Sequence, residues 1–315
     1  MRSDTSRCTI ILPVFNEESI VEKITTEVFK AFLMANIDIL FVDDGSTDST
    51  WDTIAELSKK NPLISGVRFS RNFGKESAML AGVSVATGDC MIVMDSDLQH
   101  PPETAMEMLD LWLKSDCSII EAVKIRRQDE NALKKVAANM FYKILNSTSG
   151  IDLHNGSDFK LLDRRAADII KSMPERQTFF RAMAGWTGLK TEKVYFEVPM
   201  RVGGSTKFSV FKLTKMAINS ITAYTSMPMQ IVTFIGFSFL LFAIIMTLQT
   251  FYRYFFGYAE GGFPTVIILL LIIGSILMIS LGIIGIYISK IYNEVKLRPR
   301  YIFSESVGVN LKKIN

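Results

Sequence analysis

Two aspartates separated by one serine end an apolar run in the stretch VMDSDLQHPPE, residues 93–103. Placing Asp95 and Asp97 at the end of a buried strand is costly unless positive charge faces them. Mg²⁺ in proteins is commonly held by one or two carboxylates together with substrate phosphates. We therefore predict that these two aspartates hold a divalent cation, with Gln99 as a further oxygen donor. One histidine, His100, is weak evidence for zinc beside hard oxygen ligands, and we expect it to shape the loop.

Two other polar stretches follow apolar runs. VDDGSTD, residues 42–48, is compatible with a turn and a helix cap, and equally with Asp43 and Asp44 accepting hydrogen bonds from a base or ribose. SRNFGKE, residues 70–76, places Arg71 and Lys75 before a helix. It is either a solvated loop or a diphosphate site built from two cations and free N–H groups.

Some enzyme classes are excluded by missing motifs. The sequence has no G-x-G-x-x-G fingerprint and no G-x-x-x-x-G-K-[ST] loop, which argues against a dinucleotide dehydrogenase and a P-loop NTPase. Nothing resembles the nucleophile elbow of an α/β-hydrolase.

The elements that must position these residues alternate along the first third of the chain. Apolar runs predict strands over Thr9–Val14, Ile37–Val42, Ile64–Phe69, Met91–Met94 and Ser118–Val123. Amphipathic stretches between them predict helices over Glu18–Met34, Ser49–Lys59, Glu76–Ala86 and Glu103–Lys114. This alternation indicates an α/β domain with a mainly parallel sheet, whose ligands bind at the carboxyl ends of the strands.

The last third of the chain is of a different kind. No charged residue lies between Met216 and Tyr252 or between Gly261 and Ser289. Each run exceeds the roughly 20 residues that span a bilayer core. We predict a cytoplasmic domain over 1–210, a juxtamembrane segment over 211–229, transmembrane helices over 230–252 and 264–289, and a tail over 290–315; the alternative is a buried core hairpin.

Flanking charges predict the orientation of this hairpin. Basic residues precede the first run and follow the second, whereas the connection holds only Arg253 and Glu260. By the positive-inside rule, the N-terminal domain and both termini face the cytoplasm. The formal net charge of +3 and the basic residues near the spans suit anionic lipid headgroups better than nucleic acid.

Four motifs together resemble glycosyltransferase family 2, of the GT-A fold: PVFNEE, VDDGSTD, SRNFGKESA and DSDLQHPPE, in the family's order and approximate spacing. With the two C-terminal apolar runs and RVGGSTKF, residues 201–208, the chain is similar to the polyprenyl-phosphate glycosyltransferases of that family. Bactoprenol glucosyltransferases and dolichyl-phosphate mannose synthases are the related groups. The expected fold is thus a Rossmann-like GT-A domain with a C-terminal two-helix membrane hairpin.

The resemblance implies roles for particular residues. Asp95 and Asp97, with Gln99, would hold Mg²⁺ or Mn²⁺ against a nucleotide-sugar diphosphate, and Asp158 is the usual candidate base. Donor binding would fall to Pro13, Glu17, Asp43, Asp44, Arg71, Lys75 and Ser96. Processive members of the family carry Q-x-x-R-W, a spacing that Gln177, Arg181 and Trp186 do not match, so we do not expect polymer synthesis.

The resemblance implies a lipid-phosphate acceptor, and the chemistry of that group indicates what the site must supply. A lipid monophosphate has a second pKa of about 6 and is mostly dianionic at neutral pH, so it needs cations more than a base. The candidates to hold that phosphate are Arg126, Arg127, Arg201, Ser205 and Lys207. Asp158 would then orient the acceptor or support the metal site. The 201–209 segment is either an anion-binding loop or a basic membrane anchor.

The expected reaction is an inverting, metal-dependent transfer of one sugar, with glucose the leading candidate, from a UDP-sugar to undecaprenyl phosphate at the bacterial inner membrane. The product would serve modification of a cell-surface glycan such as the O-antigen of lipopolysaccharide, through a flippase and a downstream glycosyltransferase. Gly274, Gly282 and Gly285 would permit close helix packing in a homo-oligomer. Alternatives are a GDP-mannose-dependent mannosyltransferase, a transferase acting on a diacylglycerol hydroxyl, and a non-catalytic membrane scaffold.

Overall fold

A computed structural model describes residues 5–33, 35–125, 157–175, 179–197, 227–256 and 262–309. The predicted acceptor residues Arg126, Arg127, Arg201, Ser205 and Lys207 lie outside these ranges. The described residues form two compact units. The first comprises those up to 197 together with 298–309, and the second comprises 227–256 and 262–297.

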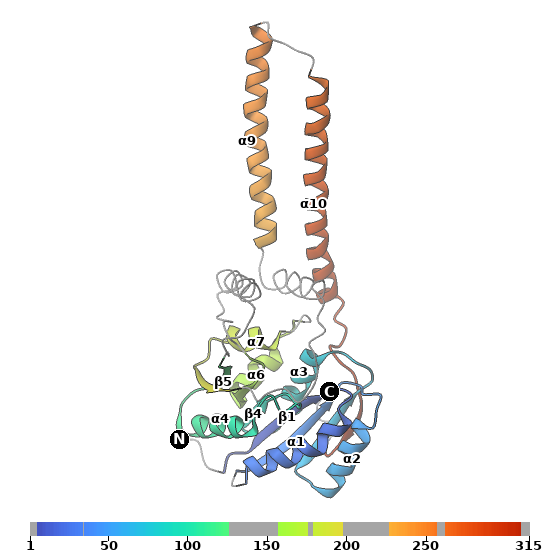
Figure 1. Cartoon of the computed structure of the whole chain (residues 1–315), viewed down its shortest axis with the longest axis vertical. Helices are drawn as coiled ribbons and strands as arrows, with labels where there is room; N and C mark the ends of the chain where they lie inside the picture. The colour runs from blue at the N-terminus through green and yellow to red at the C-terminus, as the bar shows by residue number, and fades with distance from the viewer. Residues whose placement is uncertain are drawn as a thin grey trace. The chain divides into compact units, whose positions relative to one another are not determined.

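Strands and helices alternate through the start of the first unit, as the apolar periodicity predicts. Their order is β1 (Cys8–Val14), α1 (Glu18–Ala31), β2 (Ile37–Asp43), α2 (Thr50–Lys60), β3 (Ile64–Phe69), α3 (Lys75–Val85), β4 (Cys90–Val93), α4 (Pro102–Lys114) and β5 (Ile119–Lys124) (Figure 1). After these come β6 (Lys160–Asp163), α6 (Arg164–Ser172), α7 (Phe180–Trp186) and β7 (Thr191–Phe196). Strand β8 (Phe303–Val307) belongs to the same unit.

The sheet is mixed rather than mainly parallel, which corrects the expectation from the sequence. Its strand order is β7-β5-β6-β4-β1-β2-β3-β8. The ladders β1–β2, β1–β4, β2–β3 and β5–β7 are parallel. Strand β6 runs antiparallel to both β4 and β5, and β8 runs antiparallel to β3. Apolar patterning indicates that a strand is buried but not in which direction it runs. The antiparallel directions of β6 and β8 therefore could not be predicted from the sequence.

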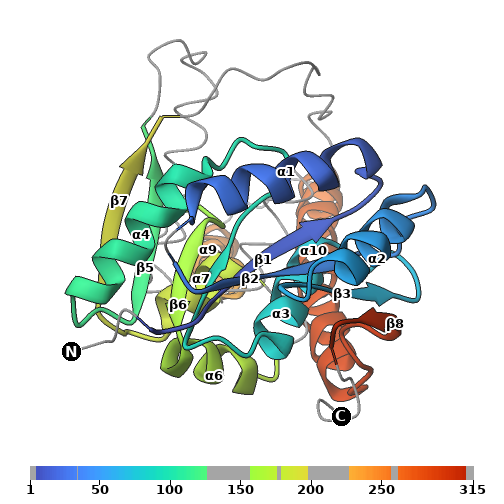
Figure 2. The same cartoon turned by 90° about the horizontal axis from the view of Figure 1, so that it is seen from below.

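Helices cover both faces of this sheet. Apolar residues of α1, α2 and α4 pack on one face, and those of α3, α6 and α7 pack on the other (Figure 2). Successive residues of β1 alternate between the two cores, with Ile10 and Leu12 on one side and Ile11 on the other. A Cβ on Gly82 would lie 2.3 Å from Cγ2 of Ile11, so glycine allows α3 to approach β1 closely.

The segment after the last helix is folded into the sheet. The expected tail 290–315 contains the end of a long helix and the edge strand β8, which Figure 2 shows beside β3. Tyr301 stacks on Phe69 with ring centroids 5.1 Å apart, and its hydroxyl lies 2.9 Å from Oγ of Ser84. The guanidinium of Arg300 donates to the carbonyl oxygen of Met173. Aromatic packing and hydrogen bonds thus hold this end of the chain to β3, α3 and the end of α6.

The second unit consists of two long apolar helices, α9 (Met227–Phe255) and α10 (Phe263–Val295). Among the described residues, one stretch is long and apolar enough to cross a membrane: Ile272–Val295, with a mean hydropathy of 2.3. The apolar stretch of α9, Val232–Met246, is shorter. Large apolar side chains on these helices are exposed, including Met278 at 70%. The two-helix membrane hairpin therefore stays a prediction.

Candidate active site

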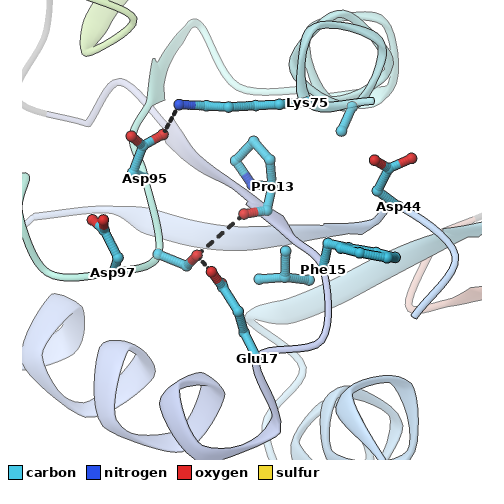
Figure 3. Close-up of a pocket in the computed structure, with 10 residues that line it drawn as sticks. Pro13, Phe15, Glu17, Asp44, Lys75, Asp95 and Asp97 are labelled. Atoms are coloured by element: carbon cyan, nitrogen blue, oxygen red, sulfur yellow. Dashed lines mark hydrogen bonds and ion pairs between the residues drawn. The ribbon is translucent and has the colours of Figure 1, made fainter. Parts of the chain in front are cut away.

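A cavity of about 230 Å³ lies where the carboxyl ends of β1, β2 and β4 meet the start of α3. Parallel strands bring the residues that follow them to one edge, so motifs far apart in the sequence converge there. The residues that line the cavity are Pro13, Val14, Phe15, Glu17, Asp44, Lys75, Ala78, Asp95, Ser96 and Asp97 (Figure 3).

The loop after β4 presents the paired aspartates. Leu98 turns the chain with a φ of 58°, in the left-handed region that non-glycine residues rarely adopt. The backbone N–H of Asp95 donates to Nδ1 of His100 at 2.9 Å, and the imidazole stacks on Phe159 with centroids 4.6 Å apart. Burial lowers the pKa of His100, so the ring is neutral and accepts this bond. His100 shapes the loop, as predicted.

Gln99 is directed at the second aspartate. Its backbone N–H donates to Oδ1 of Asp97 at 3.1 Å, and its side-chain Nε2 donates to Oδ2 at 2.7 Å. Asp97 itself is exposed. Its carboxylate is therefore held in place by its own loop while remaining open to solvent and to a ligand.

The positive charge that the paired aspartates require comes from helix α3. Nζ of Lys75 lies 2.5 Å from Oδ1 of Asp95 (Figure 3). The same Nζ lies 3.3 Å from Oδ2 of Asp158. Burial opposes the charge on this lysine, but attraction by the two carboxylates outweighs that cost and raises its pKa. Lys75 thus occupies the position of a counter-ion between the loop after β4 and the segment before β6.

Both carboxylate oxygens of Asp158 contact cationic side chains. Its Oδ1 accepts from Nε of Arg181 at 2.6 Å, and its Oδ2 accepts from Nη2 of Arg181 at 3.0 Å. Burial would raise the pKa of Asp158, yet the hydrogen bonds and charge of Arg181, together with Lys75, lower it to about 2. Such a carboxylate stays ionised and has little tendency to take up a proton.

Helix α7, which carries Arg181, is tied to α3 by a second carboxylate. Oε2 of Glu76 accepts from the backbone N–H of Phe180 at 2.8 Å. Burial raises the pKa of Glu76 to about 7, with this backbone hydrogen bond opposing the rise. The two carboxylates together fix the start of α7 against the site.

The two aspartates that end β2 have different environments. Asp44 lines the cavity and accepts from the backbone N–H groups of Phe73 and Gly74 at 2.6 and 2.9 Å, which positions the loop before α3. Asp43 is completely buried, and its carboxylate accepts from the backbone N–H of Ser46 at 2.9 Å. Asp43 therefore shapes the loop, in place of the expected direct contact with the donor. Gly45, at a φ of 72°, lets this loop pass against the backbone that follows β3.

Three further predicted donor residues, Pro13, Glu17 and Ser96, meet inside the cavity. The hydroxyl of Ser96 lies 3.3 Å from the carbonyl oxygen of Pro13 and is hydrogen-bonded to Oε2 of Glu17 (Figure 3). Burial raises the pKa of Glu17, the bond to Ser96 opposes this, and the nearby charges of Asp97 and Asp95 add to it. The loops after β1 and β4 are thereby linked across the cavity floor.

Most but not all predicted donor residues are brought together. Arg71 is not among the lining residues, and its guanidinium lies over the ring of Phe73, 4.3 Å from the centroid. Sequence reasoning missed Phe15, which lines the cavity with 42% of its surface exposed, although it lies within the motif PVFNEE. It also gave Arg181 no role at the site.

The donor set fits a hard divalent cation that arrives with a substrate. Among the described residues, no group of three or more His, Cys, Asp or Glu side chains is placed to hold a metal ion. The carboxylates of Asp95 and Asp97 are two oxygen ligands in an otherwise open site, which is how Mg²⁺ is commonly held when substrate phosphates complete its shell. Asp95 is half-buried and Asp97 is exposed, so the two carboxylates offer negative charge to a cation that approaches from the open side of the cavity.

Comparison with known proteins gives the following findings. The family model "Glycosyl transferase family 2" matches residues 9–169. A "Prophage bactoprenol glucosyl transferase homolog" from Escherichia coli (strain K12) is 36% identical over 303 residues, covering 94% of this chain and 98% of that protein. The "Bactoprenol glucosyl transferase" of Shigella phage SfII is 35% identical over 310 residues, covering 95% of this chain and 98% of its own length.

A solved structure has a similar fold. Glucosyl-3-phosphoglycerate synthase from Mycobacterium tuberculosis, in complex with Mn²⁺, uridine diphosphate and phosphoglyceric acid, matches with a TM-score of 0.51 and 16% identity. The match covers 69% of this chain and 76% of that one. It shows the GT-A arrangement of a Rossmann-like domain and a mixed sheet.

Proposed function

Because the chain belongs to glycosyltransferase family 2, we propose that it transfers glucose from UDP-glucose to undecaprenyl phosphate at the cytoplasmic face of the bacterial inner membrane, with inversion at the anomeric carbon. The relatives named as bactoprenol glucosyl transferases support this choice of sugar and lipid, because they align over nearly their full length.

The ion pairs and the low pKa of Asp158 favour a phosphate acceptor over a hydroxyl acceptor. A hydroxyl nucleophile needs a base that takes its proton during attack. Asp158, the family's candidate base, has both oxygens engaged by Arg181 and Lys75 and a pKa of about 2. A lipid phosphate, already ionised near neutral pH, needs no such base. In this reaction an acceptor phosphate oxygen bonds to the anomeric carbon as the bond to the donor diphosphate breaks, and UDP leaves with the electron pair.

The cavity supports a nucleotide donor. Phe15 offers an exposed ring at its edge, on which a base can stack. Glu17 and Asp44 offer carboxylate oxygens to ribose or base N–H and O–H groups, as acidic residues at strand ends do in nucleotide-binding folds. Lys75 is close enough to Asp95 to turn toward a diphosphate placed beside the paired aspartates.

Asp95 and Asp97 would hold Mg²⁺ or Mn²⁺. Gln99 orients Asp97 through two hydrogen bonds, and its predicted role as a further oxygen ligand stays a prediction. When bound, the cation would offset negative charge developing on the departing diphosphate, worth about 4 kcal/mol for one charge pair at ~4 Å and an effective dielectric near 20. Without it, Lys75 supplies the cation that faces Asp95.

The placement of β8 supports a membrane hairpin. Strands before and after the apolar helices belong to one sheet, so the chain between them must start and finish on the same side of any membrane. Such a segment crosses an even number of times. Helix α10 contains one qualifying stretch, and α9, with 29 residues, is about 43 Å long at about 1.5 Å per residue, enough for the return. The basic residues that flank the pair favour a cytoplasmic catalytic domain.

A donor panel tests the proposal. Purified full-length protein, in micelles containing undecaprenyl phosphate, is given UDP-glucose, UDP-galactose or GDP-mannose, each with Mn²⁺ or with a chelator. We expect nucleotide release from UDP-glucose that requires both lipid and metal. Faster release from GDP-mannose would instead identify a mannosyltransferase, and no release from any donor would point to a scaffold.

A further inference from the structure

Strand β8, which follows the membrane helices in sequence, places a carboxylate opposite an arginine of β3. In the antiparallel ladder Arg68 pairs with Glu305, and Gly66 pairs with Val307. Oppositely charged residues that face each other across strands attract. The two positions are 237 residues apart in the sequence.

Both carboxylate oxygens of Glu305 are used. Oε1 accepts from Nη1 of Arg68 at 2.9 Å, and Oε2 accepts from Nε1 of Trp51 at 2.9 Å. Trp51 lies in the first turn of α2, directly after the VDDGSTD loop, and is 4% exposed. Glu305 therefore fixes an arginine of β3 and the first turn of α2 at once.

Arg68 passes this restraint to the loop after β2. Its Nη2 donates to the carbonyl oxygen of Ser46 at 2.9 Å, and its Nε lies 3.3 Å from Oδ2 of Asp43. Asp43 is completely buried, so its charge depends on partners inside the protein. The guanidinium side chain is 27% exposed and joins β8 to a buried carboxylate and to a loop carbonyl.

The loop after β2 in turn holds the loop after β1. Oγ of Ser46 accepts from the backbone N–H of Asn16 at 2.9 Å, and Oδ1 of Asn16 accepts from the backbone N–H of Thr47 at 2.9 Å. Asn16 has a φ of 54° and lies between Phe15 and Glu17, both of which line the cavity. Asparagine tolerates the left-handed region better than most residues, and the two hydrogen bonds to the loop after β2 hold Asn16 there.

We propose that Arg68 and Glu305 are positioning residues for the donor: the strand beyond the membrane helices sets the two loops that bind the nucleotide. Neither side chain lines the cavity, and both act through Ser46 and Asn16. The inference rests on the proposed function, because it takes the cavity to be the nucleotide site.

The test compares four variants in the full-length protein: Glu305→Gln, Arg68→Met, the double variant, and Glu56→Gln as control. Glu56 is an exposed carboxylate of α2, so its replacement removes the same charge from the same region. A glutamine at position 305 can accept from only one of the two donors, because its second group is an N–H donor. Calorimetric titration with UDP and Mn²⁺ gives Kd, and initial rates give KM for each substrate. Thermal unfolding shows whether each variant folds.

We expect Glu305→Gln and Arg68→Met each to raise the Kd of UDP and the donor KM about three- to tenfold, with the lipid KM unchanged. The double variant should bind UDP no more weakly than Arg68→Met alone, because once Arg68 is replaced a glutamine at position 305 can still accept from Nε1 of Trp51. The inference would be overturned if Glu305→Gln and Glu56→Gln bound UDP with the same Kd, or if the effects in the double variant were additive. In either case, binding of UDP by the wild type would still support the donor site. Failure of the wild type to bind UDP would overturn both.

Discussion

Replacing Asp158 by asparagine should reduce the rate by a factor that does not change with pH. The pKa of this carboxyl is about 2 in the folded protein, because Arg181 and Lys75 hold the ionised form. A general base works best when its pKa is close to the operating pH, and the pKa of Asp158 lies about 5 units below neutral pH. If Asp158 moves no proton during catalysis, the wild-type rate divided by the variant rate should stay constant from about pH 8 to about pH 9, above the pKa of about 7 of Glu76, to which the charge of Asp158 contributes.

The same geometry sets the effect on stability. A fall from 3.8 to about 2 corresponds to about 2 kcal/mol. The Arg181 and Lys75 side chains are 30% and 45% exposed, so screening reduces this to about 1–2 kcal/mol. Because the folded pKa is the lower one, this stabilisation is present above pH 3.8 and is lost as the pH falls through about 2. We expect Asp158→Asn to lower the free energy of unfolding by that amount at neutral pH.

The assay measures initial rates of lipid glucosylation at each pH for the wild type, Asp158→Asn and Asp168→Asn. Asp168 is a matched control because its side chain is 62% exposed on α6 and lies 4.0 Å from Arg164. Two results would contradict this prediction: a rate deficit of Asp158→Asn that shrinks steadily as the pH rises, or a rate that imidazole restores. Either result would identify Asp158 as a base and the acceptor as a hydroxyl.

Other outcomes follow from the cavity and the sheet. Asp97→Asn should lower turnover at least ~100-fold without changing thermal unfolding, because the side chain is exposed and one metal ligand is lost; near-normal turnover with Mn²⁺ would contradict the metal assignment. Lys75→Met should tighten nucleotide-free Mn²⁺ binding about fivefold in a calorimetric titration, by freeing Asp95, whereas Lys59→Met should not; equal affinities would be evidence against competition. Phe15→Ala should raise the donor KM about fivefold with the lipid KM unchanged, and an unchanged donor KM would remove the stacking role. Reporters at the C-terminus and between α9 and α10 should behave as internal and external, and the reverse would refute the orientation.

The start of the fold was predictable because its strands and helices carry strong apolar periodicity. Helix α1 begins at Glu18 as expected but ends at Ala31, short of the expected Met34. Strand β8 was not found, since FSESV has no clear apolar run and its pairing depends on β3, far away in the sequence. Long-range pairing of this kind cannot be obtained from local patterning.

The site was predictable where residues follow parallel strands, because such ends converge. Asp43 is the last residue of β2 and Asp44 follows it. Successive side chains of a strand point to opposite faces, so only one of the two could reach the cavity, and that residue is Asp44. Two ion pairs of the site depend on how α3 and α7 pack: Asp158 with Arg181, and Lys75 with Asp95. No spacing in the sequence specifies such contacts.

The identity of the acceptor decides whether this protein glucosylates a lipid phosphate. Full-length protein is given UDP-[¹⁴C]glucose and Mn²⁺ with either undecaprenyl phosphate or undecaprenol, and the labelled lipid is identified by mass spectrometry. We expect a glucosyl phosphate ester of undecaprenol from the phosphate, and no labelled lipid from the alcohol. Labelled product from the alcohol, or none from the phosphate, would contradict this expectation.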